Sequence, residues 1–411
     1  MRARLASATT RAVNAASRRL GRGQGTVAGG RVGLRLDPKL LEHLTAGRQV
    51  ALVTGTNGKT TTTRLLTVGL GATGDAVVSN ETGSNMPPGH VAALAASAAR
   101  RAVLETDEVY LPRVLAATAA ATVVLLNLSR DQLDRTNEVR MIAGHWRAAL
   151  AAAPHTQVVA NADDPLVVWG AGAARAVHWV GAGLRWQHDA VGCPSCEGRI
   201  AFTDDSWSCV NCGFARPDPE ATLLVEADGA ARASWGDGRS APVRLHLPGR
   251  FNQANALMAA VAAEASGVDA LEALAAMEAV HEVAGRFTVR AFGDVRARLM
   301  LAKNPAGWDE LLDLVAGSEA PLVVSINSRI ADGADPSWLW DVPYERLAGR
   351  VVVATGDRFR DLSVRLSYGG VGHISEPDPV QAVARAAGGA EGVVDVIGNY
   401  TAFHELLGAP Q

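Results

Sequence analysis

The stretch LVTGTNGKTTTTRLL, residues 52–66, decides the fold. An apolar run ends in a loop with two glycines and a lysine, and a helical pattern follows. Such a strand, turn and helix surround an anion with backbone N–H groups and a helix N-terminus. We expect Lys59 to reach the outer phosphates of a nucleotide triphosphate and Thr60 to bind Mg²⁺. The alternative is a glycine turn that only ends a strand.

The loop is a short variant of the common phosphate-binding motif. The usual spacing, G-x-x-x-x-G-K-[ST], would require glycine at position 53, where this chain has Val53. Here the loop runs from Gly55 to Thr60. The expected ATP contacts from this stretch are Thr56, Asn57, Gly58, Lys59, Thr60 and Thr61.

Composition indicates a globular protein of two or three domains: 411 residues, 48% hydrophobic and 20% charged. A net charge of -3 gives no general attraction for nucleic acid, so we expect none as a partner. No run approaches the 18 apolar residues of a membrane span, and no signal peptide is visible. We expect a cytoplasmic protein.

Residues 1–35 form a basic N-terminal segment. One interpretation is a solvated, partly helical arm, and the other is a surface that approaches anionic lipid head groups at the inner membrane face. The first is favoured because the alanine-rich opposite face is weakly apolar.

Strand-like runs alternate with alanine-rich helical stretches, which predicts an α/β fold with a parallel, doubly wound sheet. After Arg286 a second series of strand-like runs begins, which predicts a smaller α/β domain. The predicted strands lie at 49–55, 101–107, 121–129, 156–164, 294–302, 321–326, 350–355 and 392–397. The predicted parts are the arm at 1–35, a central ATP-binding domain at 36–290 with an insertion at 186–218, and a C-terminal domain at 291–411.

The insertion contains all four cysteines, as CPSC and CVNC. Two C-x-x-C pairs separated by twelve residues are typical of a zinc ribbon, in which four thiolates form a closed structural site. Redox dithiols or disulfides are the alternatives, and a reducing cytoplasm disfavours disulfides. The predicted zinc ligands are Cys193, Cys196, Cys209 and Cys212.

The short phosphate loop resembles that of the Mur ligase and folylpolyglutamate synthase superfamily, which uses ATP to turn a carboxylate into an acyl phosphate that an amine attacks. The resemblance implies that Glu105 in LETDE, with Asp107 beside it, binds Mg²⁺. In NLSRDQLDR the chain has Gln132 where the superfamily usually has histidine, and no lysine after Asp134 matches its carbamoylated lysine.

The resemblance also implies nucleotide contacts farther along the chain. NADDP (161–165) corresponds to an adenine-side turn, and GRFNQANAL (249–257) corresponds to a helix start that supplies Asn255. Phe251 stands where many members have histidine. AGRF (284–287) supplies Arg286, and KNPAG implies that Asn304 closes on the nucleotide from the second domain.

Only about fifty residues precede the loop, so we expect this chain to lack the sugar-nucleotide domain that Mur ligases usually have there. The chain resembles the MurT family of ligase subunits, which carry a four-cysteine ribbon and form a heterodimer with the glutaminase subunit GatD. The marks of that family are LAKNPAGW (301–308) and INSRIADGADPSWLWDVPYE (326–345). The resemblance implies that Asp332 orients the partner's catalytic histidine; alternatively, Asp332 or Asp335 caps a helix that bears Trp338 and Trp340.

This resemblance implies that the enzyme amidates the α-carboxylate of D-glutamate in a stem peptide, either in lipid II or in another muropeptide. ATP would drive the reaction, and GatD would supply the ammonia. Catalysis would depend on Lys59, Glu105 and Asp332. An amino-acid ligase of the folylpolyglutamate or cyanophycin type is one alternative, and a non-catalytic nucleotide-binding scaffold is the other.

Overall fold

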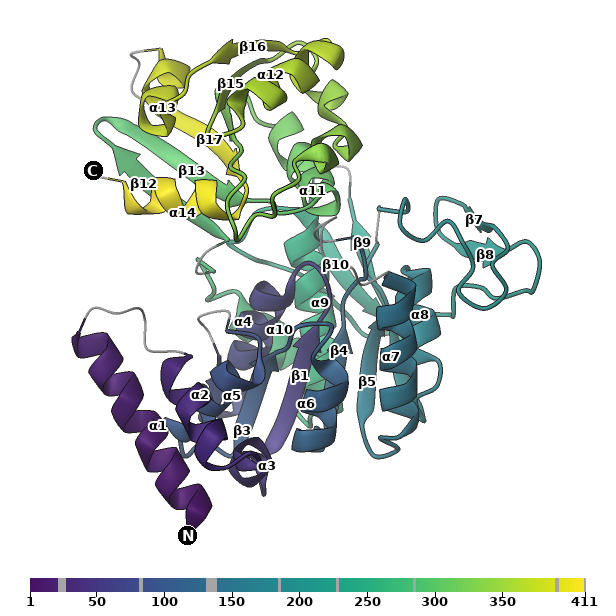
Figure 1. Cartoon of the computed structure of the whole chain (residues 1–411). Coiled ribbons are helices and arrows are strands. Elements are labelled where there is room, and N and C mark those ends of the chain that lie inside the picture. Colours follow the sequence, from purple (N-terminus) through teal and green to yellow (C-terminus); the bar gives the residue numbers. More distant parts are fainter. Residues whose placement is uncertain are drawn as a thin grey trace. The chain divides into compact units, whose positions relative to one another are not determined.

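The structure is a computed structural model that describes residues 1–20, 27–80, 84–130, 139–183, 186–226, 229–283, 286–388 and 392–409. Two compact units divide the chain. The first takes most of the chain up to His281, and the second takes the chain from Glu282 together with short segments at Arg130 and Pro248. Each unit has its own main sheet (Figure 1).

The first unit contains a nine-stranded sheet in the order β11-β10-β9-β6-β5-β4-β1-β3-β2. The strands from β2 to β9 run parallel, and β10 and β11 extend the sheet in antiparallel fashion. This confirms the predicted α/β class. The strands are β1 (Gln49–Thr54), β2 (Val77–Ser79), β3 (Arg101–Glu105), β4 (Thr122–Leu125), β5 (Gln157–Asn161), β6 (Ala176–Gly181), β9 (Ala221–Val225), β10 (Ala231–Trp235) and β11 (Ser240–Pro242).

Helices cover both faces of this sheet, which explains why its central strands are apolar along their whole length. Val50 and Leu52 of β1 share a core cluster with α6 and α7, while the equally buried Ala51 and Val53 point to the opposite face. The helices α4, α9 and α10 contact one another. The helices are α1 (Arg2–Arg19), α2 (Ala28–Leu36), α3 (Leu40–Thr45), α4 (Lys59–Leu70), α5 (Pro87–Ala95), α6 (Leu111–Thr118), α7 (Val139–Ala151), α8 (Pro165–Ala171), α9 (Arg250–Ala265) and α10 (Ala270–Met277), with a 3₁₀ turn η1 (Gly71–Thr73).

The N-terminal segment differs from the predicted solvated arm because α1 and α2 pack on the rest of the first unit. The helix α1 contacts α2, α3 and α5. Glycines make this packing close: a Cβ atom at Gly29 or Gly33 would overlap Thr10, and one at Gly30 would overlap Pro88. The side chain of Asn14 also accepts a hydrogen bond from the Gly29 N–H, at 2.8 Å.

The insertion forms a separate small lobe beside α8 (Figure 1). Its two short antiparallel strands, β7 (Ile200–Phe202) and β8 (Trp207–Cys209), form a sheet of their own. The two strands of the insertion therefore stand outside the main sheet.

The second unit contains a six-stranded sheet in the order β12-β13-β17-β14-β15-β16, parallel except for the β12–β13 hairpin. The predicted boundary near residue 291 falls within β12, whose half-exposed side chains give no buried-strand pattern. The strands are β12 (Phe287–Phe292), β13 (Val295–Leu301), β14 (Leu322–Ser325), β15 (Val351–Thr355), β16 (Gly372–Ser375) and β17 (Gly392–Gly398). The helices are α11 (Pro305–Ala316), α12 (Phe359–Tyr368), α13 (Pro379–Ala387) and α14 (Tyr400–Gly408), with 3₁₀ turns η2 (Ser337–Asp341) and η3 (Tyr344–Leu347).

None of the helices in the described part of the chain is long and apolar enough to span a membrane.

Candidate functional site

The phosphate loop joins β1 to α4, and its conformation depends on Gly55, which has a φ of 141°, and on Gly58. Gly58 is the N-cap of α4 and has a φ of 84°, a backbone conformation that favours glycine. A Cβ atom there would also lie 2.7 Å from the Oδ1 atom of Asn255. Asn255, an expected ATP contact on α9, therefore lies directly against the loop. The first N–H groups of α4, which helical geometry leaves without intrahelical acceptors, are available to an anion at this point.

Lys59 begins α4, and its side chain is buried within the site. Its Nζ atom donates to Thr56 O at 3.1 Å and to the carboxylate of Glu108 at 3.0 Å. The side chains of Lys59 and Glu108 are only 5% and 10% exposed, so both charges are held inside the protein. A buried ammonium requires a compensating negative charge. Glu108 provides it here, and nucleotide phosphates would provide it in a complex.

Glu105 ends β3, which pairs with β1 so that Val53 lies opposite Glu105. The parallel register therefore places this carboxylate at the strand end from which the phosphate loop departs. Glu105 is 2% exposed, and its Oε2 atom is buried without a hydrogen-bond partner among the described residues. A buried carboxylate oxygen of this kind fits a hard cation such as Mg²⁺.

Two buried side chains hold the backbone of Glu105. Asn80 accepts from the Glu105 N–H at 2.8 Å and donates to the Glu105 carbonyl at 2.9 Å. His90 Nε2 donates to the same carbonyl at 2.7 Å. Burial lowers the pKa of His90 to about 4, although its hydrogen bond to the Glu105 carbonyl acts in the opposite direction. His90 is therefore neutral near pH 7, and it orients Glu105 without adding charge.

The segment after β4 holds the phosphate loop from the other side. Asn127 accepts from the Asn57 N–H at 2.9 Å and donates to the Asn57 carbonyl at 3.1 Å. The carboxylate of Asp164, in the turn before α8, accepts from the Leu128 N–H at 2.8 Å. Burial raises the pKa of Asp164 to about 6, and its backbone hydrogen bonds oppose this shift. The NADDP turn thus holds the segment after β4, which in turn holds the phosphate loop.

The second unit contains the remaining expected site residues. Asn304 is fully buried and caps α11 by accepting from the Gly307 N–H at 2.9 Å. Arg286 immediately precedes β12 and lowers the pKa of His404 in addition to the larger effect of burial. The roles of Asn304 and Arg286 toward ATP stay predictions.

Asp332 lies in the loop after β14, where it is 7% exposed. Its carboxylate accepts from the Thr401 N–H at 2.8 Å, from the Thr401 hydroxyl, and from the Arg329 N–H at 3.1 Å. Asp332 therefore ties this loop to the first turn of α14. The helix that bears Trp338 and Trp340 is instead contacted by Asp335, whose carboxylate accepts from the Ser337 N–H at 2.8 Å. The role of Asp332 toward a partner's histidine stays a prediction.

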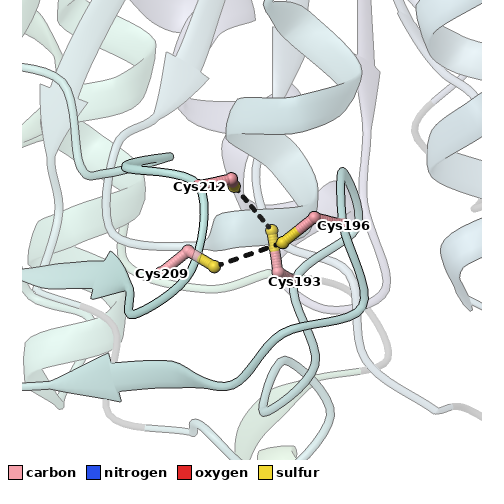
Figure 2. A group of neighbouring side chains, drawn as sticks. All are labelled: Cys193, Cys196, Cys209 and Cys212. Carbon is pink, nitrogen blue, oxygen red and sulfur yellow. Dashed lines mark hydrogen bonds between the residues drawn. The ribbon is translucent and has the colours of Figure 1, made fainter.

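The four cysteines converge within the insertion (Figure 2). Their sulfur atoms all lie within 4.8 Å of one another, with Cys193–Cys212 at 3.7 Å and Cys196–Cys209 at 3.5 Å. Tetrahedral thiolates at Zn–S distances of about 2.3 Å stand about 3.8 Å apart. The N–H of Asn211 lies 3.4 Å from the Cys209 sulfur, where it can donate to a thiolate. The arrangement fits a metal ion with four thiolate ligands.

Glu108 was missed by the sequence reasoning, which placed Asp107 beside Glu105 at the site. Asp107 accepts from the Val109 N–H in a local turn, at 3.1 Å, and its place beside Glu105 at a Mg²⁺ site stays a prediction. The available signal was the spacing of Glu108 three residues after Glu105. Gln132 and Asp134 lie outside the described residues.

Two family models match the chain. The Mur ligase middle domain matches residues 53–189, and the MurT ligase C-terminal domain matches residues 301–403.

Curated relatives match nearly the whole chain. The MurT subunit of lipid II isoglutaminyl synthase (glutamine-hydrolyzing) from Streptococcus pneumoniae is 27% identical, over 95% of this chain and 94% of the relative. The corresponding subunit from Staphylococcus aureus strain COL is 28% identical, over the same shares of the two chains. Among solved structures, a pseudomurein peptide ligase type C from Methanothermus fervidus matches with a TM-score of 0.69 and 20% identity, over 93% of this chain and 85% of that one.

Proposed function

Because the chain belongs to the MurT family of the Mur ligase superfamily, we propose that it is the synthase subunit of a lipid II isoglutaminyl synthase. The reaction would convert the α-carboxylate of D-glutamate in the stem peptide of lipid II into the amide of D-isoglutamine. ATP would supply the energy, and a partner glutaminase would supply ammonia. This reaction belongs to peptidoglycan synthesis.

One observation carries the proposal for this chain. A buried lysine at the start of α4 and a buried carboxylate at the end of β3 lie at neighbouring strand ends of a parallel sheet. Open α/β sheets bind ligands at this edge. The Lys59 ammonium supports phosphate binding. The Oε2 atom of Glu105, which has no hydrogen-bond partner among the described residues, supports a cation.

The chemistry would proceed through an acyl phosphate. Gly58, Lys59 and Thr60 would bind the phosphates of ATP, and Thr60 and Glu105 would hold Mg²⁺. When bound, that ion offsets the charge of the phosphates. The substrate carboxylate attacks the γ-phosphorus, which forms the acyl phosphate and releases ADP. Ammonia then attacks the carbonyl carbon and phosphate leaves. We also propose Arg286 and Asn304, in the second unit, as ATP contacts; groups of this kind contribute mainly by positioning the reactants.

Ammonia production requires a second protein in this proposal. A cysteine-dependent glutaminase needs a free thiol nucleophile, and all four cysteines of this chain converge on the insertion. The partner would be the glutaminase GatD, in a heterodimer with this chain. Asp332 would orient the partner's catalytic histidine.

We propose zinc as the metal of the cysteine cluster. Four thiolates within 4.8 Å of one another suit tetrahedral Zn²⁺, and such a site leaves no coordination position open for catalysis. The ion would stabilise the insertion, whose strands of three residues each are too short to be stable alone.

The N-terminal helices would bring the protein to the inner face of the plasma membrane, where lipid-linked substrates reside. The first 36 residues contain eight arginines and no acidic residue, whereas the other residues carry 31 basic and 42 acidic side chains. Arg4, Arg11 and Arg18, spaced at sevens on α1, form one exposed line, and Leu5 beside them is 65% exposed. Replacing the three arginines with alanine should abolish sedimentation with phosphatidylglycerol vesicles. Sedimentation equal to the wild type would exclude this role.

The test of the proposed function is amidation of lipid II by the purified chain with the glutaminase, glutamine, ATP and Mg²⁺. Mass spectrometry should detect the small mass decrease when OH becomes NH₂. Lys59→Ala should abolish amidation without unfolding the protein. The control Lys39→Ala, whose lysine is 72% exposed, should leave the rate unchanged. Product formed without nucleotide cleavage would contradict the proposal.

The same assay separates the alternatives. An amino-acid ligase of the folylpolyglutamate or cyanophycin type would join an amino acid to its substrate without a second protein. A nucleotide-binding scaffold would bind ATP but would not cleave it when lipid II is added.

A further inference from the structure

We infer that the four-cysteine insertion braces the phosphate loop, so that metal binding to the insertion sets the affinity for nucleotide. This inference rests on the proposed nucleotide binding and adds a role for residues of the insertion in positioning the loop. Three consecutive layers of hydrogen bonds in the first unit carry it.

The first layer joins the insertion to the NADDP turn. The indole N–H of Trp207, on β8, donates to the carbonyl of Ala162 at 3.0 Å. The guanidinium of Arg216 pairs with Asp163 at 2.7 Å, and both side chains are largely buried. Val168 of α8 packs against Cys193, Ile200, Trp207 and Cys209 in a shared apolar cluster. The insertion is therefore docked on the turn and on the helix that follows it.

The second layer joins that turn to the segment after β4. Asn161 donates to the Leu126 carbonyl at 3.0 Å, and the Leu128 N–H donates to Asp164 at 2.8 Å. Asp164 is 2% exposed and also accepts from the first N–H groups of α8. Because this carboxylate holds two backbone segments at once, displacement of the turn would displace the segment after β4.

The third layer joins that segment to the phosphate loop. The Thr56 N–H donates to the Asn127 carbonyl at 2.9 Å, and Asn127 makes two further bonds to the backbone of Asn57. The Thr56 hydroxyl donates to the Ser129 carbonyl at 3.0 Å and accepts from the Ser129 N–H at 2.9 Å. Thr56 and Asn57 directly precede Gly58 and Lys59, so this layer fixes the start of the anion site.

Metal binding would control the first layer because it orders the residues that make it. Trp207 lies two residues before Cys209 and Arg216 lies four residues after Cys212, so both positions are set by metal ligands. A lobe this small has little apolar core with which to stay folded without the ion. Loss of the metal would therefore release Trp207 and Arg216 from the NADDP turn.

The test measures nucleotide affinity directly, using the full chain, the ATP analogue AMPPNP with Mg²⁺, and titration calorimetry. Trp207→Phe keeps the ring but removes the N–H donor. It should keep its zinc and raise the Kd for AMPPNP roughly three- to tenfold, the range of one net hydrogen bond. Amide hydrogen exchange at residues 53–60 should become faster. Removing zinc from the wild type with a chelator should raise the Kd for AMPPNP at least as much. In the zinc-free protein, Trp207→Phe should cause no additional rise in that Kd.

Trp186→Phe is the matched control, because that indole donates to Asp189 within the insertion, at 2.6 Å, and not to the NADDP turn. It should leave the Kd unchanged. Arg216→Met is a second variant that should raise the Kd if Trp207→Phe fails to fold. Wild-type affinity in zinc-loaded Trp207→Phe or Arg216→Met, or in the zinc-free wild type, would overturn the inference. A wild type that binds no nucleotide would instead refute the proposed function.

Discussion

His90 should make the stability of the first unit depend on pH, and His90→Gln should remove this dependence. Burial lowers the pKa of His90 to about 4, from an ordinary value of 6.5. The unfolded chain therefore binds a proton between pH 6.5 and pH 4 that the folded chain rejects, so stability falls as the pH falls through this window. Between pH 7 and pH 5 the loss should be roughly 2 kcal/mol. Glutamine can keep the hydrogen bond to the Glu105 carbonyl because its amide donor replaces Nε2.

The assay is urea unfolding of the wild type and the variant at both pH values, followed by circular dichroism. The wild type should lose roughly 2 kcal/mol more unfolding free energy than His90→Gln between pH 7 and pH 5. His155→Gln is the control, since His155 is exposed, and it should behave like the wild type. Equal losses in the wild type and His90→Gln would show that His90 titrates normally and is not the buried neutral group described above.

Three further substitutions test the site. Glu108→Gln should lower the melting temperature without nucleotide, because the buried charge of Lys59 loses its counter-charge. Adding Mg²⁺ and ATP should then raise the melting temperature of the variant more than that of the wild type. Equal rises in the variant and the wild type would contradict this. Gly58→Ala should abolish ATP binding in calorimetry. The control is Gly74→Ala, because Gly74 has the same φ of 84° but no atom within 4 Å of its Cβ position. It should cost about 1–2 kcal/mol of backbone strain and keep ATP binding. Asp332→Ala should impair glutamine-driven amidation more than amidation from free ammonium; equal loss would assign this carboxylate to capping α14 alone.

Several features followed from local sequence because local geometry is enough to produce them. A phosphate loop needs a strand, glycine and Lys-Thr within a few residues, and the structure has β1, Gly58 with a positive φ, and α4 starting at Lys59. The paired C-x-x-C motifs likewise predicted the cysteine cluster, because each pair places two sulfurs together by itself.

Contacts between distant segments could not be predicted in this way. The sequence does not single out Glu108, because an acid in a strand-to-helix turn is usually solvated. In the structure α7 packs over that turn, and Trp146 donates to the Glu108 carbonyl at 2.8 Å. The basic composition of the N-terminal segment predicts a solvated arm. The close packing at its three glycines, Gly29, Gly30 and Gly33, depends on a neighbouring helix that composition does not reveal.

The sequence by itself determined the α/β class, the phosphate loop, the cysteine cluster and the family. Each depends on residues within a short span or on a whole-chain pattern of strands and helices. Tertiary structure alone decided which carboxylate meets Lys59, that both oxygens of Asp332 bond within the second unit, and that the insertion reaches the phosphate loop through the turn before α8. Those contacts join residues far apart in the chain, so side-chain packing sets them and no local propensity encodes them.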